Sequence, residues 1–270
     1  MNYFNQSPTN IYVAGHRGWL NKYPENTIPS FMAAIELGVD QIETDVRITK
    51  DGELVLIHDE TVNRTTNGVG AVRDYTLAEL KELDAGSYMG KNFKNVRIPT
   101  FREFFELIKD HPTLTVNIEL KEYPDREPGW DKVAFSVCDR VVKMVEEYNF
   151  KDRVLLNSFS LPLMEYIKKN HPDYKRHVFF PLVKMLGEGE NPYDKAYCAC
   201  VYGPEGTEKC LATAEEIIDF HKKTGIRIWM GKYIHDEKTV DLAIPCGVEL
   251  ITCNNPDEIL NILRKKGLHK

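Results

Sequence analysis

The sequence predicts a (β/α)₈ barrel that forms one domain over residues 1–270. Short segments rich in β-branched residues alternate about eight times with segments of helical periodicity, as in barrels of parallel strands. The length suits a single barrel, and neither an internal repeat nor a linker divides the chain. A doubly wound open sheet is the alternative that the same alternation allows.

One interruption breaks this alternation in the first half of the chain. Residues 60–98 contain NGVG and many polar side chains, so we expect a small insertion after the second strand. The segment just before it follows a KDGE turn and is expected to pair back on that strand as a hairpin. The elements expected in this half are strands at 11–14, 40–48, 54–59 and 114–120 and helices at 29–38 and 101–110.

The second half keeps the alternation except at residues 184–196, whose GEGENP stretch is a poor helix. Cys198 and Cys200 have strand spacing and should share a face rather than bind a metal. The elements expected here are strands at 154–159, 177–183, 197–202, 226–230 and 248–253 and helices at 131–148, 161–170, 213–225, 238–247 and 256–267.

Composition narrows the classes of function. The chain is 42% apolar and 28% charged, with a net charge of -6 from 35 basic and 41 acidic residues. These values are typical of a soluble globular protein and do not provide the basic surface that nucleic acids require. Residues 1–10 do not resemble a secretory signal, and no apolar run is long enough for an integral membrane segment.

The six cysteines show no C-x-x-C spacing and are expected to be reduced thiols. Together with the missing signal and membrane segment, they predict a cytoplasmic protein. Homo-oligomerisation is left open by the sequence.

Two predicted strands carry acidic residues on the face that should point into the barrel. In QIETDVRI, Glu43 and Asp45 share the face opposite to Ile42, Val46 and Ile48, and in VNIEL Glu119 lies opposite to the apolar face in the same way. Buried carboxylates are costly unless a cation compensates them. An all-oxygen set favours a divalent ion such as Mg²⁺ or Ca²⁺. A metallohydrolase site with histidine ligands is a rival hypothesis, although the spacings H-x-H and H-E-x-x-H are absent.

Further functional side chains follow the ends of the predicted strands, where barrels place their active sites. His16 and His58 suit acid and base chemistry near neutral pH. Arg17 and Lys121 suit a phosphate group. A metal, two cations and two histidines around one point describe a site for cleaving a phosphodiester.

These residues lie in motifs that resemble the glycerophosphodiester phosphodiesterase family. The matching stretches are AGHRG, PENTIPSFMAAIELGVDQIETDVRITKDGELVLIHDETVNRTTNG, TLAELKELDAG, IPTF, IELK and NSF. They cover roughly the first 160 residues in order. The later half is similar mainly at Trp229 and in GVELIT.

The resemblance implies a (β/α)₈ barrel enzyme that converts a glycerophosphodiester and water into sn-glycerol 3-phosphate and an alcohol. It implies that His16 and His58 are the acid–base pair and that one divalent ion binds Glu43, Asp45 and Glu119. Arg17, Lys121 and Trp229 would contact the substrate. Attack by water and formation of a cyclic phosphate by the glycerol 2-hydroxyl both remain open.

Two departures from the family pattern concern the substrate pocket. Trp229 is followed by Met230, Gly231 and Lys232 rather than Thr-Val-Asn, and Thr252 is followed by Cys253 and Asn254 rather than Asp. Two other functions stay open at this stage, namely a lysophospholipase D and a barrel that binds phosphodiesters without turnover.

The stretch from His16 to Thr27 should form a tight turn and then begin the first helix. Gly15 and Gly18 permit sharp backbone turns around His16 and Arg17. Asn26 or Thr27 can cap the helix, and Glu25 is expected to hold Arg17 in place.

Overall fold

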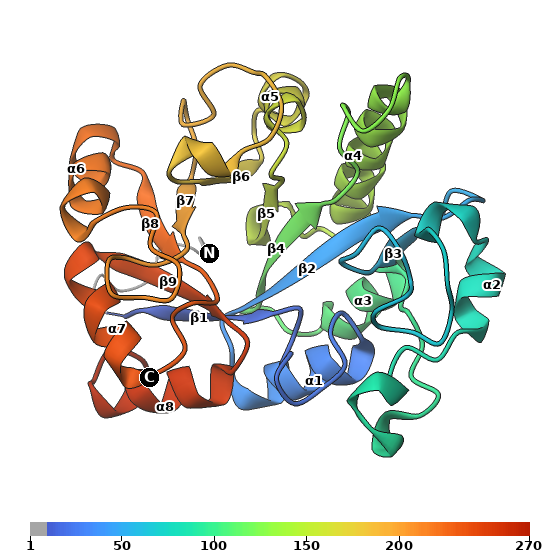
Figure 1. Cartoon of the computed structure of the whole chain (residues 1–270), viewed down its shortest axis with the longest axis horizontal. Coiled ribbons are helices and arrows are strands. Elements are labelled where there is room, and N and C mark those ends of the chain that lie inside the picture. Colours follow the sequence, from blue (N-terminus) through green and yellow to red (C-terminus); the bar gives the residue numbers. More distant parts are fainter. Residues whose placement is uncertain (1–9) are drawn as a thin grey trace.

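The computed structural model describes residues 10–270 and shows a closed barrel of eight parallel strands (Figure 1). The first strand pairs with both the second and the last, which closes the barrel and excludes the open sheet. Segment 1–9, expected not to be a secretory signal, lies outside the described residues. The barrel strands are β1 (Tyr12–His16), β2 (Gln41–Ile48), β4 (Thr115–Leu120), β5 (Val154–Asn157), β6 (Lys175–Phe179), β7 (Cys198–Val201), β8 (Arg227–Met230) and β9 (Val248–Cys253).

The ninth strand, β3 (Leu54–Leu56), pairs antiparallel with β2 and forms the expected hairpin, although it ends earlier than predicted. The strand expected at 177–183 is shifted: β6 begins at Lys175 and ends at Phe179. Pro181 has no N–H to donate to a neighbouring strand, so the ladder cannot continue through it.

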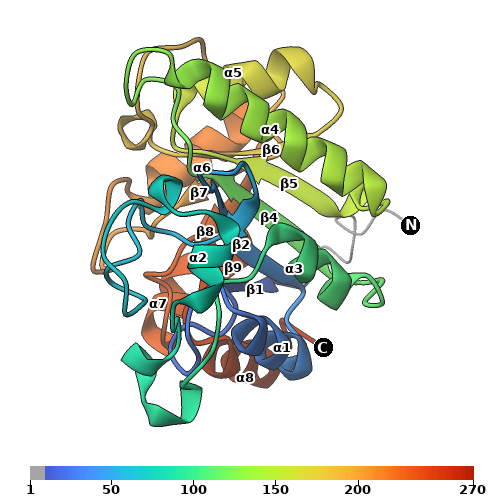
Figure 2. The same ribbon diagram turned by 90° about the vertical axis from the view of Figure 1, so that its right-hand side faces the viewer.

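Helices cover the outside of the barrel, as Figure 2 shows for α3, α4 and α5. Between β6 and β7 the described chain forms a 3₁₀ turn (Leu182–Lys184) and irregular structure in place of an α-helix, as the poor helical pattern of 184–196 indicated. The outer helices are α1 (Ile28–Leu37), α3 (Phe101–Ile108), α4 (Trp130–Glu147), α5 (Leu161–Asn170), α6 (Ala214–Thr224), α7 (Glu237–Ala243) and α8 (Pro256–Lys265).

The main core lies between the strands and these helices. Ile42 and Val46 of β2 face outward and pack with fully buried phenylalanines of α1 and α3. Phe31 meets Phe104 edge-on, with ring centroids 4.8 Å apart. The apolar residues of β2 therefore face the helices, and the intervening Glu43 and Asp45 point into the barrel, as the strand alternation predicted.

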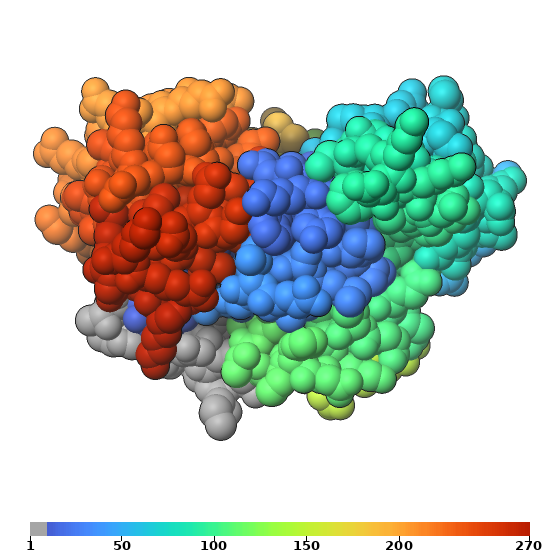
Figure 3. Space-filling model, turned by 90° about the horizontal axis from the view of Figure 1, so that it is seen from below, coloured from blue at the N-terminus to red at the C-terminus, as the bar shows by residue number. Residues whose placement is uncertain are grey.

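The inserted segment forms a small lobe with its own core beside β2 and β3 (Figure 1). It contains the short helix α2 (Leu77–Glu82), which begins with a capping box between Thr76 and Glu79. Seen from below, the blue N-terminal segment lies between this lobe and the red C-terminal segment (Figure 3). The insertion is therefore part of the barrel's flank and reaches residues near the first strand.

Candidate active site

The carboxyl ends of β1, β2 and β4 and the turn after β3 converge on one cavity of about 130 Å³. Asp45 lies fully buried between the residues that line it. The predicted site residues that line the cavity are His16, Arg17, Glu43, His58, Glu119 and Lys121.

Close backbone packing shapes the turn that carries His16 and Arg17. Arg17 adopts a left-handed conformation with φ of 55°, and its backbone N–H donates to the Glu43 carbonyl at 3.0 Å. A Cβ on Gly15 would lie 2.6 Å from the carbonyl oxygen of Gly18, and one on Gly18 would overlap Ser30. Both glycines are therefore required where the chain folds tightly beneath the histidine.

The carboxylates of Glu43, Asp45 and Glu119 place oxygen atoms within 4.8 Å of one another. Burial, with repulsion from Asp45 and Glu119, raises the pKa of Glu43 well above its usual value. Burial alone would raise the pKa of Asp45 too, but Lys121 and Arg17 hold it below its usual value. Asp45 Oδ1 also accepts no hydrogen bond. A buried, all-oxygen set in which Glu43 still has a raised pKa fits a hard divalent cation.

The two candidate catalytic histidines have different partners. His16 Nδ1 lies 2.6 Å from Asn254 Oδ1, and its Nε2 lies 3.8 Å from Glu43 Oε2. His58 Nδ1 lies 2.6 Å from Asp59 Oδ1. Burial lowers the pKa of both imidazoles, and the cationic Arg17 adds to this effect at His16.

Arg17 and Lys121 are already held by carboxylates. Glu25 accepts a 2.7 Å hydrogen bond from Arg17 Nη1, which is the positioning role expected for Glu25, and Asp45 lies 3.2 Å from Arg17 Nε. The Lys121 ammonium contacts Glu119 and lies 3.2 Å from Asp45 Oδ1. Both cations thus border the carboxylate cluster, where a phosphate bound to a metal would meet them.

Of the two residues expected to cap α1, Thr27 does so by its position, but it makes no capping hydrogen bond through its side chain. Thr27 occupies the N-cap position, but its hydroxyl donates to the Pro24 carbonyl at 2.5 Å. Asn26 instead donates to Asp45 Oδ2 at 2.8 Å. Asn26 therefore supports Asp45 in the site and does not cap the helix.

Other residues that support the site had no local sequence signal. Arg64, in the insertion, donates to Glu25 at 2.7 Å and to Asp59 at 2.6 Å. Tyr88, also in the insertion, accepts from the Glu25 backbone N–H at 2.9 Å. Asn254 stood out in the sequence only as a departure at the end of the last strand. Side chains of the insertion therefore fix Glu25 and Asp59, the two carboxylates that contact Arg17 and His58.

Trp229 is the predicted site residue that the structure does not bring to this cavity. It is 3% exposed and packs inside the barrel with Leu155, Cys198 and Leu250. It lines a different cavity, at the amino-terminal end of the strands near Tyr12. Its position is that of a packing residue inside the barrel.

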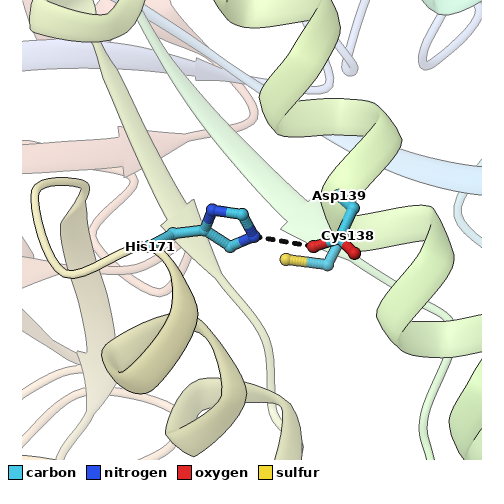
Figure 4. A group of neighbouring side chains, drawn as sticks. All are labelled: Cys138, Asp139 and His171. Atoms are coloured by element: carbon cyan, nitrogen blue, oxygen red, sulfur yellow. Dashed lines mark hydrogen bonds and ion pairs between the residues drawn. The ribbon is translucent and has the colours of Figure 1, made fainter.

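A second group of metal-ligand type lies outside the barrel, where α4 meets the end of α5 (Figure 4). His171 Nε2 lies 2.7 Å from Asp139 Oδ1, and the Tyr166 hydroxyl donates to the same carboxylate at 3.1 Å. Burial raises the pKa of the Cys138 thiol. The Asp139 carboxylate on α4 thus joins the two helices through Tyr166 and His171.

Comparisons with known proteins identify the family of this chain. The model of the glycerophosphoryl diester phosphodiesterase family matches residues 16–258. The chain belongs to this family. It is 39% identical over 255 residues to a glycerophosphodiester phosphodiesterase of Caldanaerobacter subterraneus, covering 94% of this chain and 98% of the relative. Identity to a glycerophosphodiester phosphodiesterase of Bacillus altitudinis is 42% over 251 residues, or 93% and 97% of the two chains. As a member of this family, the protein is a phosphoric diester hydrolase.

Solved structures share the fold. A putative glycerophosphodiester phosphodiesterase from Galdieria sulphuraria superposes with a TM-score of 0.74 at 27% identity, covering 94% of this chain and 98% of its own. An Oleispira antarctica phosphodiesterase, in complex with the product sn-glycerol-3-phosphate, has a TM-score of 0.76 at 24% identity and covers 96% and 100%. Among the described residues, no helix combines the length and apolar character needed to cross a membrane.

Proposed function

We propose that this enzyme hydrolyses glycerophosphodiesters to sn-glycerol 3-phosphate and an alcohol, using one Mg²⁺ or Ca²⁺ ion. The observation that carries the proposal is the buried set Glu43, Asp45 and Glu119, which opens on the same cavity as two histidines and two cations. The structural relative from Oleispira, whose product is sn-glycerol-3-phosphate, supports this choice of product.

The three carboxylates would hold the ion, which supplies positive charge at the phosphoryl oxygens and lowers the pKa of a bound hydroxyl or water. Arg17 and Lys121 add fixed positive charge beside it. Because carboxylates hold both side chains in place, their charges are oriented before the substrate arrives.

His16 and His58 divide the proton transfers. The neutral amide of Asn254 holds His16 through Nδ1 and leaves Nε2 toward the cavity, which suits a base that removes a proton from the attacking hydroxyl or water. Burial lowers the pKa of His58, and the Asp59 carboxylate opposes this shift by stabilising the cationic form, in which His58 would act as the acid that protonates the leaving alcohol oxygen.

We further propose that the enzyme acts in the cytoplasm. All six cysteines are free, and all but Cys210 are buried. Free thiols in this number are typical of proteins from reducing compartments.

The test is release of sn-glycerol 3-phosphate from glycerophosphocholine and glycerophosphoethanolamine with Mg²⁺, with Ca²⁺ and with chelator. The variants are His16→Ala and Glu119→Gln, and Asp139→Asn of the outer cluster is the matched acidic control. We expect metal-dependent activity that both site variants lose and the control keeps. Activity in chelator, or in Glu119→Gln at the wild-type level, would overturn the metal assignment. Turnover restricted to lysophospholipids would replace the substrate with a lipid.

A further inference from the structure

A chain of three uncharged polar side chains crosses the interior of the barrel on strands β4, β5 and β6. Asn157 Nδ2 donates to Asn117 Oδ1 at 2.8 Å, and Asn117 Nδ2 lies 2.9 Å from His177 Nδ1. All three side chains line the cavity that holds the catalytic residues. None of the three has a role in the metal, phosphate or proton-transfer chemistry.

Both ends of this row of hydrogen-bonded side chains lack a hydrogen-bond partner. His177 Nε2 and Asn157 Oδ1 are buried and form no hydrogen bond, although the two residues are only 3% and 1% exposed. Leaving such a polar atom unpaired in a protein interior is energetically costly. These two unsatisfied atoms lie on neighbouring strands at one cavity wall, so they form a candidate site for a ligand group.

The required group follows from the direction of the hydrogen bonds. With Asn117 donating to His177 Nδ1, the His177 proton lies on Nε2, so one end is a donor and the Asn157 oxygen is an acceptor. Reversing every bond in the chain exchanges the two ends but still leaves one donor and one acceptor. A hydroxyl group, which accepts and donates at once, matches either arrangement.

His177 is suited to a neutral ligand group. Burial lowers the pKa of His177 to about 3, so the imidazole is uncharged near neutral pH. Its ring is fixed between Phe179, with centroids 5.1 Å apart, and Trp229, at 5.5 Å. Trp229 thus packs against His177 although it does not line the cavity itself.

The three hydrogen-bonded side chains form the floor of the cavity. Asn117, Asn157 and His177 each lie two residues before another lining residue that is near or beyond the carboxyl end of the strand, namely Glu119, Phe159 and Phe179. Phe159 and Phe179 stack at 3.9 Å between centroids and form a wall above the floor. A group bound at the floor has little room for variation, whereas a variable alcohol can extend toward the opening.

We propose that Asn157 and His177 bind one hydroxyl of the glycerol moiety of the substrate and so select glycerol-containing phosphodiesters. The inference rests on the proposed function and adds positioning residues on β5 and β6. The alcohol group would then lie toward the opening and contribute less to selection.

The experiment compares glycerophosphocholine, whose hydroxyls all belong to glycerol, with two analogues that each lack one of these hydroxyls. Binding of the corresponding glycerol phosphate and its two deoxy analogues to the Mg²⁺-supplemented protein is measured by calorimetry. His177→Phe and Asn157→Leu each remove one of the two unpaired atoms. Either variant alone therefore tests the hydroxyl site if the other fails to fold. Cys198→Ala is the matched control, because it is buried beside His177 in the strand register but does not line the cavity.

We expect the wild type and Cys198→Ala to prefer the intact ligand over one deoxy analogue by about 10- to 100-fold in kcat/KM and in affinity. In His177→Phe and Asn157→Leu this ratio should fall toward 1, mainly because the intact ligand loses affinity and kcat/KM. An unchanged ratio would overturn the inference and assign the two atoms to a buried water. Equal losses with all three ligands would overturn it in favour of a purely structural role.

Failure of the proposed function has a different signature. The wild type could cleave no glycerophosphodiester and still bind glycerol phosphate with a hydroxyl preference that depends on His177 and Asn157. In that case the catalytic proposal fails and the glycerol site stands. Hydrolysis without a preference that depends on His177 would support the catalytic proposal and overturn the glycerol site. If the wild type neither cleaves the diester nor binds glycerol phosphate, both proposals fail.

Discussion

Asn254 holds His16 across 238 positions of sequence, through a 2.6 Å contact between Asn254 Oδ1 and His16 Nδ1. His16 is the last residue of β1, and Asn254 directly follows β9. These are the two strands whose pairing closes the barrel. The orientation of one candidate catalytic residue therefore depends on closure itself.

Replacing Asn254 with Leu should lower kcat by roughly 10- to 100-fold, because His16 loses the acceptor that fixes its ring and tautomer. KM should change little, since Asn254 holds an imidazole and does not line the cavity. Asn170→Ala, in an exposed asparagine of α5, is the control and should leave kcat unchanged. A wild-type kcat in Asn254→Leu would show that closure does not position His16.

Arg64→Gln should reduce kcat about tenfold, because this side chain joins Glu25, which holds Arg17, to Asp59, which holds His58. The free energy of unfolding should change by about 0–1 kcal/mol, because Arg64 is half-exposed. Steady-state kinetics and urea unfolding measure the two effects. Arg73→Gln removes a comparable ion pair with Glu127 elsewhere in the insertion and should be silent in activity. Equal activity in the two variants would contradict a role of the insertion in catalysis.

Trp229→Phe should destabilise the protein by about 1–3 kcal/mol, because the smaller ring leaves space inside the barrel. Thermal or denaturant unfolding gives this value. The family resemblance assigns Trp229 to substrate contact, and in that case KM would rise while stability stayed near wild type. The position of Trp229 below the catalytic cavity predicts the reverse.

The chain terminus provides a pH-dependent contribution to stability. His269 Nε2 lies 2.9 Å from Asp40 Oδ2, and this hydrogen bond is the main cause that raises the pKa of His269 above its usual value near 6.5. The folded state therefore binds the proton more tightly than the unfolded state. The stabilisation should be complete below about pH 6.5 and should be lost as the pH rises through the folded-state pKa.

Wild type and His269→Gln should accordingly differ most in denaturant midpoint at mildly acidic pH and converge in alkaline solution. Lys270→Gln, at the adjacent exposed position, is the control and should follow the wild type. A difference that grew with rising pH would contradict the ion pair.

Much of the fold and of the carboxylate cluster could be predicted from the sequence, because those features follow local rules. A strand sends alternate side chains to opposite faces, so the spacing of Glu43 and Asp45 between apolar neighbours placed both carboxylates inside any barrel. The absence of a helix in 184–196 was likewise visible as a lack of helical periodicity. The end of β6 was misplaced because apolar residues continue past Phe179 although Pro181 cannot extend the ladder.

By itself, the sequence determined the barrel, the inserted lobe, the strand face that carries the acids and the strand ends that carry the histidines, since strand periodicity and turn chemistry act over a few residues. Only the tertiary structure decided which atoms meet: Asn254 with His16, Arg64 with Asp59, and Asn157 and His177 on neighbouring strands at one cavity wall. Such contacts depend on strand register and on closure of the barrel, which sum many weak packing terms over the whole chain. No short segment contains that information.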